Sequence, residues 1–481
     1  MGSIGSLGIA VSGLYANQRS LDVTGHNISN VNTPGYSRQS AIQASSFPQN
    51  IGYSGAGVRM QRGTGVDLML IQQYRDEFLD IKFRRANKEL GYWDAKQSGV
   101  EELEAIFNDL SEEGIQSAME KFWNSWEQLS KPTGRLTSRA LVKESAIALV
   151  ESLQHADQLL KNFRKNKDSE IKDTVQRIND ITKRVAELND MIMKVEGSGA
   201  MANDFRDERN LLIDELSALA DVQVVYGKSV SVLMEGRAVV DLNNYEELET
   251  VPDPDKNGLV MLRWKSDKSS VSIQHGRMKA LFDTRDELVD GFRAKLDEMV
   301  KGLANEVNKI HNSGYGIKDE VQRNFFINKG NPSSNEIDIG SIAFNPELND
   351  YDNIAAAMDL PPYNNEDNRI ALAIVELRNK NIFDQEEYNE SAGRYDFDEY
   401  YRNIIMELGR IGIEAAITAD AQISMIKELN TKKGAIMDVS LDEEMSNLIR
   451  FEHSYNASAR MINVMDEMLD IVVNRLGIIG R

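Results

Sequence analysis

The sequence predicts a mainly α-helical protein in which both chain ends form a long, coiled-coil-like helical bundle, with a small antiparallel β domain inserted. Three observations support this fold class. Apolar residues recur with heptad spacing at both ends and through a long central stretch. A Val-rich stretch with short alternations interrupts the helices at about residues 222–276. The chain of 481 residues is also too long for one typical core.

The domain organisation follows from these patterns. We expect a terminal helical domain built from residues 1–50 and 436–481, and a helical bundle built from residues 51–221 and 277–435. The β domain occupies residues 222–276. Because the helical pattern resumes after it, the β domain is an insertion, and both chain ends share one helical core.

The N-terminal segment has the pattern of a helix with one apolar stripe. Its spacing alternates between three and four residues, as in a helix that packs along one seam. The apolar members of the stripe are Ile4, Leu7, Val11, Leu14, Leu21 and Ile28. Each internal glycine weakens an isolated helix by about 1 kcal/mol relative to alanine. We therefore expect this segment to be disordered alone and helical only when other chains surround it.

The stretch "NISNVNTPGY" ends this helix. Pro34 fixes its own φ and restricts Thr33, so the helix must stop before them. Pro34 and Gly35 suit the centre of a type II turn, and asparagine side chains can bond the backbone groups freed at a helix end. The predicted turn motif comprises Asn27, Asn30, Asn32, Thr33, Pro34, Gly35 and Tyr36.

The C-terminal segment is predicted to be a second long helix. The stretch "SLDE" has the form of a capping box, with Ser440 at the N-cap and Glu443 at the third helical position. Apolar residues then repeat every seven positions, at Leu441, Leu448, Tyr455, Ile462, Leu469 and Leu476. The functional interpretation is that this stripe pairs with the N-terminal helix. The simpler alternative is an ordinary bundle helix.

The interior is predicted to be helical on both sides of one break. Helix is expected from about residue 64 to 130 and from about residue 137 to 195, with "SKPTGR" between them. Trp93, Trp123 and Trp126 are the expected core anchors of the first stretch.

Composition excludes several functions. A formal net charge of −21 would repel nucleic acids and anionic membranes, so neither is an expected partner. The absence of cysteine excludes disulfides, thiolate catalysis and cysteine-bound metals. No stretch approaches about 18 apolar residues, so no membrane span is expected. The start also lacks the basic and apolar regions of a secretory signal peptide.

Motifs for catalysis, cofactors and metals are not found. The stretch "DPDKNG" begins like a calcium loop, but its twelfth position is Trp264, where a bidentate glutamate is needed. The five histidines lack metal-ligand spacing. No nucleotide-binding glycine loop or serine nucleophile elbow is present. We therefore predict no catalytic residue, no cofactor and no metal, and a protein that is not an enzyme.

Both ends resemble one family. "LGIAVSGLYANQRSLDVTGHNISNVNTPGYSRQ" resembles the N-terminal signature of the bacterial flagellar axial proteins, which form rod, hook and hook-associated structures. "VSLDEEMSNLIRFEHSYNASARMINVMDEMLDIVVNRLG" resembles their C-terminal signature. The "SRQ" and "SLDEE" stretches are most similar to the hook-associated members at the first hook–filament junction zone. His26 departs from the family, which usually has an amide there.

The resemblance implies a structural role and a set of partners. The family's terminal helices pair and assemble around the axial export channel, so the two apolar stripes would form the polymerisation interface. Expected partners are further copies of the chain, the hook protein, the second junction protein and an export chaperone on the C-terminal helix. The family also implies secretion by the flagellar type III apparatus and a place in the extracellular flagellum.

Two alternatives stay open at this point. One is a hook or rod subunit of the same family, against which the "SLDEE" stretch and the long helical middle argue. The other is a cytoplasmic coiled-coil scaffold, signalling module or enzyme. An enzyme should show a convergent polar constellation, and the sequence shows none.

Overall fold

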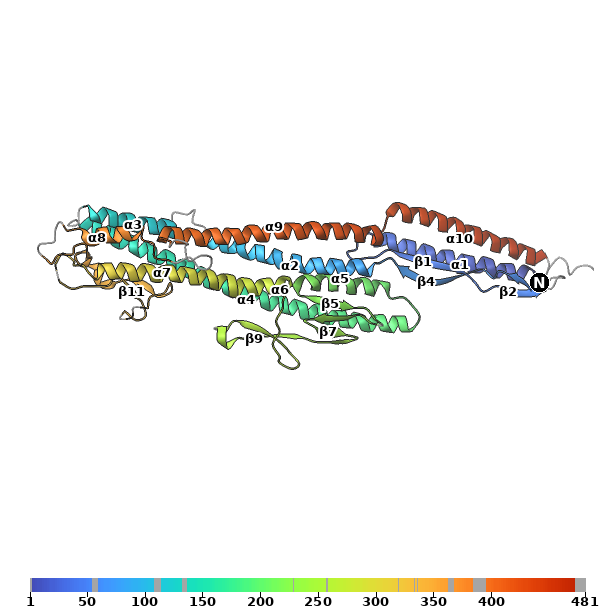
Figure 1. The fold of residues 1–481 in the computed structure, drawn as a ribbon. Coiled ribbons are helices and arrows are strands. Elements are labelled where there is room, and N and C mark those ends of the chain that lie inside the picture. The colour runs from blue at the N-terminus through green and yellow to red at the C-terminus, as the bar shows by residue number, and fades with distance from the viewer. Residues whose placement is uncertain are drawn as a thin grey trace, which may run out of the picture.

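The structure is a computed structural model that describes most of the chain. It covers residues 2–53, 59–107, 114–131, 136–227, 229–256, 258–318, 320–332, 334, 336–361, 367–383 and 395–471. The molecule is an elongated rod (Figure 1). Helices from the two ends of the chain lie side by side at one end of the rod, and the middle of the chain builds the rest. The predicted fold class is therefore confirmed.

Long helices run along the rod. Their bounds are α1 Gly2–Ser29, α2 Glu77–Ile106, α3 Ile115–Ser130, α4 Leu136–Gly197, α5 Asn203–Leu219, α6 Gly276–Phe282, α7 Val289–His311, α8 Arg369–Leu377, α9 Phe397–Met437 and α10 Leu441–Asp470. A π-helical turn at Asp283–Leu288 joins α6 to α7, and 3-10 turns lie at Pro254–Lys256, Pro346–Asn349 and Tyr351–Asn353. In the part of the chain that the structure describes, no helix has the length and apolarity to cross a bilayer.

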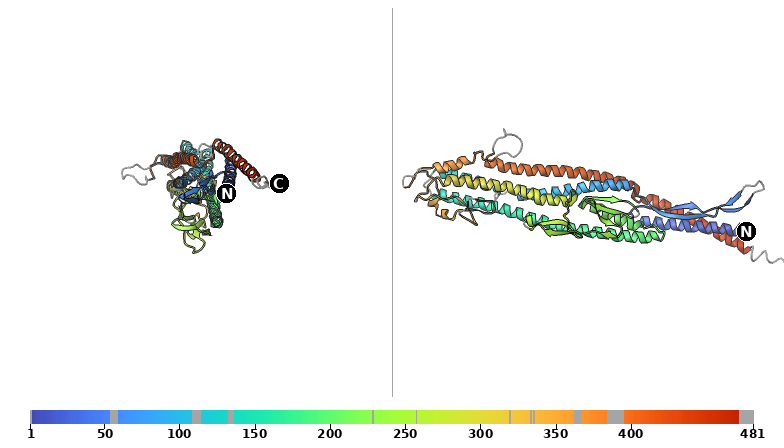
Figure 2. Two further views of the ribbon diagram at one scale, coloured as in Figure 1. Left: turned by 90° about the vertical axis from the view of Figure 1, so that its right-hand side faces the viewer. Right: turned by 60° about the horizontal axis from the view of Figure 1, so that its bottom comes forward.

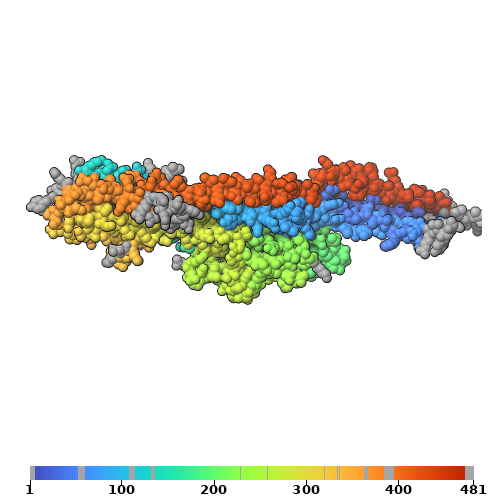
Figure 3. All heavy atoms as spheres, in the orientation of Figure 1, coloured from blue at the N-terminus to red at the C-terminus, as the bar shows by residue number. Residues whose placement is uncertain are grey.

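The strands form short antiparallel sheets. Their bounds are β1 Gln39–Ser45, β2 Gln49–Tyr53, β3 Arg59–Arg62, β4 Val66–Gln73, β5 Val222–Val225, β6 Ser231–Met234, β7 Arg237–Asp241, β8 Asn244–Tyr245, β9 Leu248–Pro252, β10 Val260–Trp264, β11 Phe326–Asn328 and β12 Ile342–Phe344. Strands β5 to β8 form one sheet in chain order, and β9 pairs with β10. These strands project from the side of the rod (Figure 3).

A β ribbon follows α1. β1 pairs with β4 from Gln39 opposite Gln73 to Ser45 opposite Val66, and β2 pairs with β3. The ribbon runs beside α1 and α10 (Figure 2). The prediction of helix from residue 64 is therefore wrong for residues 66–73. A short apolar run cannot be assigned to helix or strand by periodicity alone, and its pairing with β1 decides here.

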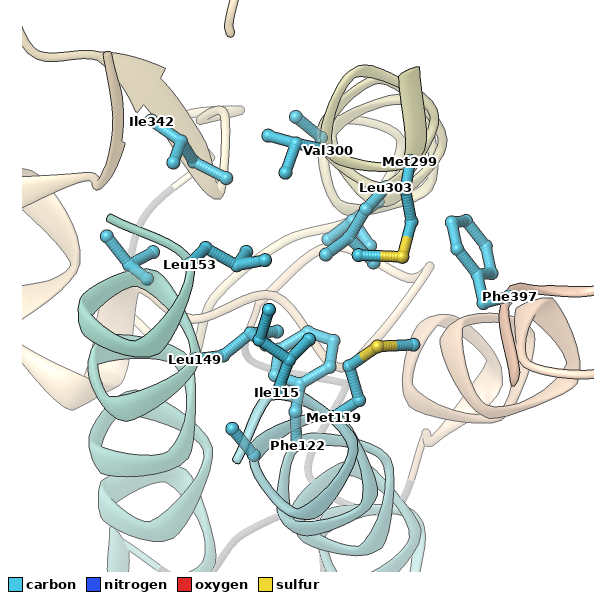
Figure 4. Packing of buried hydrophobic residues seen from close by; sticks show 14 of the residues in the cluster. Ile115, Met119, Phe122, Leu149, Leu153, Met299, Val300, Leu303, Ile342 and Phe397 are labelled. Atoms are coloured by element: carbon cyan, nitrogen blue, oxygen red, sulfur yellow. The ribbon is translucent and has the colours of Figure 1, made fainter. Parts of the chain in front are cut away.

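One core fills the end of the rod away from α1 and α10. It joins α3, the first half of α4, α7, α8 and the start of α9, with Phe122, Leu149 and Leu303 among its buried members (Figure 4). Trp123 and Trp126 are buried in it, as predicted. Trp93 is only half-buried, so the third anchor is wrong. Its ring instead lies 5.0 Å from the ammonium of Lys96.

A second core lies beneath the side strands. It joins the second half of α4 and the apolar face of α5 to strands β5, β6, β7, β9 and β10, with Ile178, Ile213, Val232 and Trp264 buried. α4 is 62 residues long because its apolar stripe serves both cores in turn. Neither core includes a residue of α1 or α10.

His311 is fully buried in the first core. Its Nε2 accepts the Ala355 N–H at 3.0 Å, so Nδ1 carries the proton and donates to the Arg323 carbonyl at 2.6 Å. Only the neutral imidazole can make both bonds. Burial lowers the pKa of His311 to about 4.

We expect acid to destabilise this end of the rod through His311. Its folded pKa lies below the unfolded value of 6.5, so its contribution is intact above pH 6.5 and is lost as the pH falls towards 4. The loss in unfolding free energy should reach about 3 kcal/mol. Denaturant unfolding at pH 7, 6 and 5 measures the first part of this loss, about 2 kcal/mol by pH 5. His311→Gln should flatten the slope, whereas the exposed His155→Gln should not; equal slopes would contradict the assignment.

Candidate assembly surface and its junction with the bundle

Helices α1 and α10 form a helix pair along one end of the rod. α10 lies lengthwise on α1 (Figure 1). At Gly13 the two helices approach so closely that a Cβ there would lie 3.2 Å from Ser458 Oγ. The side of α10 that carries Ser458 also carries its half-buried heptad residues, namely Leu448, Phe451, Tyr455, Ile462, Met465 and Leu469.

The residues of the two predicted stripes differ in how far they are buried. Leu7, Val11, Leu14, Leu21 and Ile28 of α1 are all half-buried. At the start of α10, by contrast, Leu441 is 48% exposed, because the pairing with α1 does not cover it. The side chain of Ile4 and the whole of Leu476 lie outside the described residues.

A second face of α1 was not predicted. Small side chains on it are buried beneath the β ribbon, including Ala16 and Ser20. Gln43 Nε2 of β1 donates to Ser20 Oγ at 2.8 Å, and the Val66 N–H of β4 donates to Ser12 Oγ at 3.2 Å. α1 is therefore held between α10 and the ribbon. The signal that could have shown this face is the run of Gly, Ala and Ser along α1.

The outward face of α10 carries a second apolar stripe. We call it the assembly surface, and its members are Leu441, Met445, Ile449, Met461, Val464, Met468 and Ile471, each between 46% and 52% exposed. They recur at spacings of three and four residues, apart from one gap of twelve. Grouped exposed apolar side chains are typical of interaction sites, whereas singly scattered ones are normal on a soluble protein. The assembly surface is thus suited to contact with another chain.

Asn27 fixes the end of α1. It is 1% exposed and uses its whole hydrogen-bonding capacity. Its Nδ2 donates to the Gln39 carbonyl at 2.8 Å and to Glu444 Oε2 at 3.1 Å. Its Oδ1 accepts from the Tyr36 hydroxyl at 2.7 Å and from the Gln39 N–H at 3.0 Å. One side chain thereby joins α1, the turn, the ribbon and α10.

The turn itself has the geometry that Pro34 and Gly35 require. The Tyr36 N–H donates to the Thr33 carbonyl at 3.2 Å, and Gly35 has φ +77°. A side chain at Gly35 would be strained and would also meet Leu211 of α5 at 3.2 Å. The other asparagines do less than Asn27. Asn30 Oδ1 accepts the Thr33 hydroxyl at 3.0 Å, and Asn32 is exposed.

Aromatic and acidic groups hold the turn against α5. His26 Nε2 lies 3.2 Å from Asp204 Oδ1, and its ring packs edge-on to Tyr36 at 5.5 Å. Burial raises the pKa of the Tyr36 hydroxyl, and the nearby carboxylates raise it further. The hydroxyl therefore stays protonated and remains a donor.

Ion pairs connect the turn to α10. Ser440 is the N-cap of α10 and accepts the Glu443 N–H, as a capping box requires. The Glu443 carboxylate is paired with Arg38 at 2.8 Å, and Glu444 is paired with the same guanidinium at 3.0 Å. The Arg38 N–H also donates to the carbonyl of Met437, the last residue of α9. Arg38 therefore fixes the position where α9 ends and α10 begins.

A buried polar cluster joins the terminal helices to the bundle. Asp207 of α5 accepts from the Ser37 N–H at 2.9 Å and the Ser37 hydroxyl at 2.7 Å. Arg75, before α2, is paired with Asp80 at 2.6 Å, and Lys433 of α9 is paired with Asp80 at 3.0 Å. Burial opposes ionisation of Asp80, but the surrounding cations outweigh it and lower its pKa. We call these groups, with Asn27, Arg38 and Glu444, the junction cluster.

Known protein families and relatives match this chain along most of its length. The family Flagellar hook-associated protein FlgK helical domain matches residues 100–326. Flagella basal body rod protein matches residues 7–36, and Flagellar basal body rod FlgEFG protein C-terminal matches residues 436–476. Flagellar hook-associated protein 1 of Bacillus subtilis (strain 168) is 30% identical over 509 residues, covering 97% of each chain.

The chain belongs to the flagellar hook-associated protein 1 family. The family members from Escherichia coli (strain K12) and Salmonella typhimurium are 23% and 22% identical, each covering 97% of this chain and 98% of its own. The structure of the flagellar hook junction protein FlgK from Burkholderia pseudomallei has the same fold, with a TM-score of 0.63 over 74% of this chain and 100% of that one, at 14% identity. The resemblance to flagellar axial proteins is confirmed, and the chain is a structural protein of the bacterial flagellum.

Proposed function

We propose that this hook-associated protein connects the flagellar hook to the filament as a ring of like subunits around the export channel. The observation that carries this is the assembly surface on α10, which the folded chain leaves uncovered. Neighbouring copies would bury it, and the apolar area buried would offset the entropy lost in ordering the chain ends. The terminal domain expected at residues 1–50 and 436–481 would carry this contact together with the ribbon strands up to β4, which pair with β1 beside α1. The rest of residues 51–435 would form the outer body, with the β insertion at 222–276.

The same proposal assigns no catalysis to the chain. The family is structural. The polar groups of the junction cluster form hydrogen bonds and ion pairs with one another, and they do not point towards a substrate site. In the described ranges, His, Asp and Glu side chains do not gather in a group of three that could hold a metal ion.

The proposed partners follow from the family and from the exposed surface of α10. The hook protein and the second junction protein would flank the ring, and an export chaperone would cover α10 before assembly. The support for a chaperone is physical, because an apolar stripe on a free monomer is an aggregation hazard. Export would place the chain outside the cell, at the hook–filament junction.

Deletion of the gene distinguishes this function from that of a hook or rod subunit. Cells without the chain should build hooks of normal length that carry no filament, and should release filament protein into the medium. The wild-type chain should restore filaments and be found in sheared flagella. Loss of the hooks themselves would instead identify a hook or rod subunit.

We also expect the two ends to be less stable than the bundle in the free monomer. α1 is rich in glycine, and α10 is covered mainly by α1. Limited proteolysis should therefore remove residues 1 to about 35 and about 440 to 481 first, and leave a resistant central fragment. Mass spectrometry of the fragments measures this. A verified monomer that resists cleavage at both ends would contradict it.

A further inference from the structure

A polar cavity lies beside the junction cluster, where α4 ends and α5 begins. Its volume is about 340 Å³. It lies between the end of β4, the first turn of α2, the end of α4, the start of α5 and the loop from β5 to β6. Its basic lining residues are Arg75, Arg206 and Arg209, and its acidic ones are Glu77, Asp80 and Glu196.

Not every charged residue of this cavity has a partner of opposite charge. Arg75 is paired with Asp80, and Arg206 with Glu196 at 2.7 Å. Glu77 is exposed at the rim. Arg209 is the remaining cation, and among the described residues no carboxylate lies within ion-pair distance of it.

Arg209 is nevertheless buried. It is 7% exposed, and its Nη1 donates to Asn189 Oδ1 at 3.0 Å. Its Nε is buried without a hydrogen-bond partner. Burial lowers the pKa of Arg209 to about 10; Arg206 and Arg84 add to this effect, and Tyr226 and Glu196 oppose it, so Arg209 is still charged at neutral pH. A buried, unpaired cation is costly unless an anion accompanies it.

The same cavity is lined by two further side chains with an unpaired polar atom, Asn203 and Ser229. Asn203 is 4% exposed, and its Nδ2 is fixed by the Gln39 Oε1 at 3.1 Å and the Ile71 carbonyl at 3.0 Å. Its Oδ1 is therefore held in one orientation, and it is buried without a partner. The hydroxyl oxygen of Ser229 is also buried without one. An anion bound here must accept from Arg209 and donate to Asn203.

We propose that this cavity binds a small oxyanion that carries its own proton, of the hydrogen phosphate class. The oxyanion accepts from Arg209 Nε, and its hydroxyl donates to Asn203 Oδ1. Sulfate meets the first requirement but lacks the proton for the second. α5 begins at Asn203 with no side-chain cap, so its positive end adds to the attraction.

A bound anion would tie the chain ends to the bundle. Asn203 contacts the ribbon through Gln39 and Ile71, while Arg209 contacts α4 through Asn189. The ligand would bridge these two groups across the position where the terminal helices join the body of the rod. It would thus stiffen this junction, independently of whether the chain assembles.

The test is calorimetric titration of the full-length monomer with sodium phosphate at pH 7, with sodium sulfate at matched ionic strength. Phosphate should bind saturably and raise the midpoint of thermal unfolding. Sulfate should bind at least about tenfold more weakly, because one buried acceptor stays unpaired. Equal affinities would overturn the proposed ligand class, and a response without saturation would overturn the site.

Two variants and a control locate the binding. Arg209→Met removes the cation and should weaken phosphate binding by about tenfold or more. Ser229→Asp supplies an internal carboxylate and should abolish phosphate binding while the chain still folds, which keeps the test decisive if Arg209→Met does not fold. Arg177→Met, at a half-exposed ion pair on α4, should bind phosphate as the wild type does. Wild-type affinity in either cavity variant would overturn the proposal.

Discussion

Replacing Asn27 with alanine should release the helix pair from the bundle while leaving the bundle folded. The variant would leave four groups without their partner: the Gln39 N–H and carbonyl and one oxygen of Glu444, whose bonds are buried, and the part-buried Tyr36 hydroxyl. Each unpaired buried group costs about 1–3 kcal/mol, so the four together should lower the stability of this region by at least about 4 kcal/mol. This is enough to unfold the ends locally, because they have little core of their own.

Hydrogen exchange followed by mass spectrometry measures the effect. Amides of α10 should exchange at least about a hundredfold faster in Asn27→Ala, which corresponds to about 2.7 kcal/mol. Peptides of α4 around Leu149, in the first core, should be unchanged. The matched control is Asn32→Ala, in the same turn but exposed. If both variants behave alike, Asn27 does not hold the junction.

A charge on either face of α10 should block assembly, but for two different reasons. Ile462 lies on the half-buried side towards α1, and Val464 on the assembly surface is 46% exposed. Ile462→Asp places a carboxylate in the helix pair and should loosen it in the monomer. Val464→Asp should leave the monomer unchanged, because its side chain touches solvent there. Both should leave cells with hooks but few or no filaments.

The pair of measurements is the monomer's hydrogen exchange and the number of filaments per cell. Asn463→Asp, at an exposed position between the two, is the control and should retain filaments. Normal filaments with Val464→Asp would show that the outward stripe does not touch a neighbour. A loosened monomer with Val464→Asp would show that this residue belongs to the helix pair itself.

Periodicity predicted the helical architecture because long helices carry their own signal. The seven-residue repeat from Leu448 to Leu469 faces α1, and the pattern around residues 171–195 lies on the buried side of α4. The ribbon could not be found in this way. Its strand β4 is a short apolar run whose partner, β1, is set by long-range pairing, and a chain's local pattern does not encode such pairing.

The junction cluster shows a second limit of sequence reasoning. The proline and glycine of the turn predicted where α1 ends, but they did not single out Asn27 among the asparagines. Its partners lie up to 417 positions away, at Glu444. Likewise, Glu443 was assigned to a capping box, whereas its carboxylate is paired with Arg38, and the reciprocal box occurs at Asp396 and Glu399 of α9. Such contacts depend on which helices and strands come together in the folded chain, and the local sequence pattern does not show this.

Cysteine accessibility tests the proposed assembly surface most directly, because the chain has no cysteine of its own. Val464→Cys should react rapidly with a maleimide in the monomer and be protected at least about tenfold in sheared hook–filament preparations, since a neighbouring copy would cover it. Asp267→Cys, at an exposed position in the turn after β10, is the control and should react in both states. Equal reactivity of Val464→Cys in monomer and flagellum would show that α10 does not form the contact between subunits.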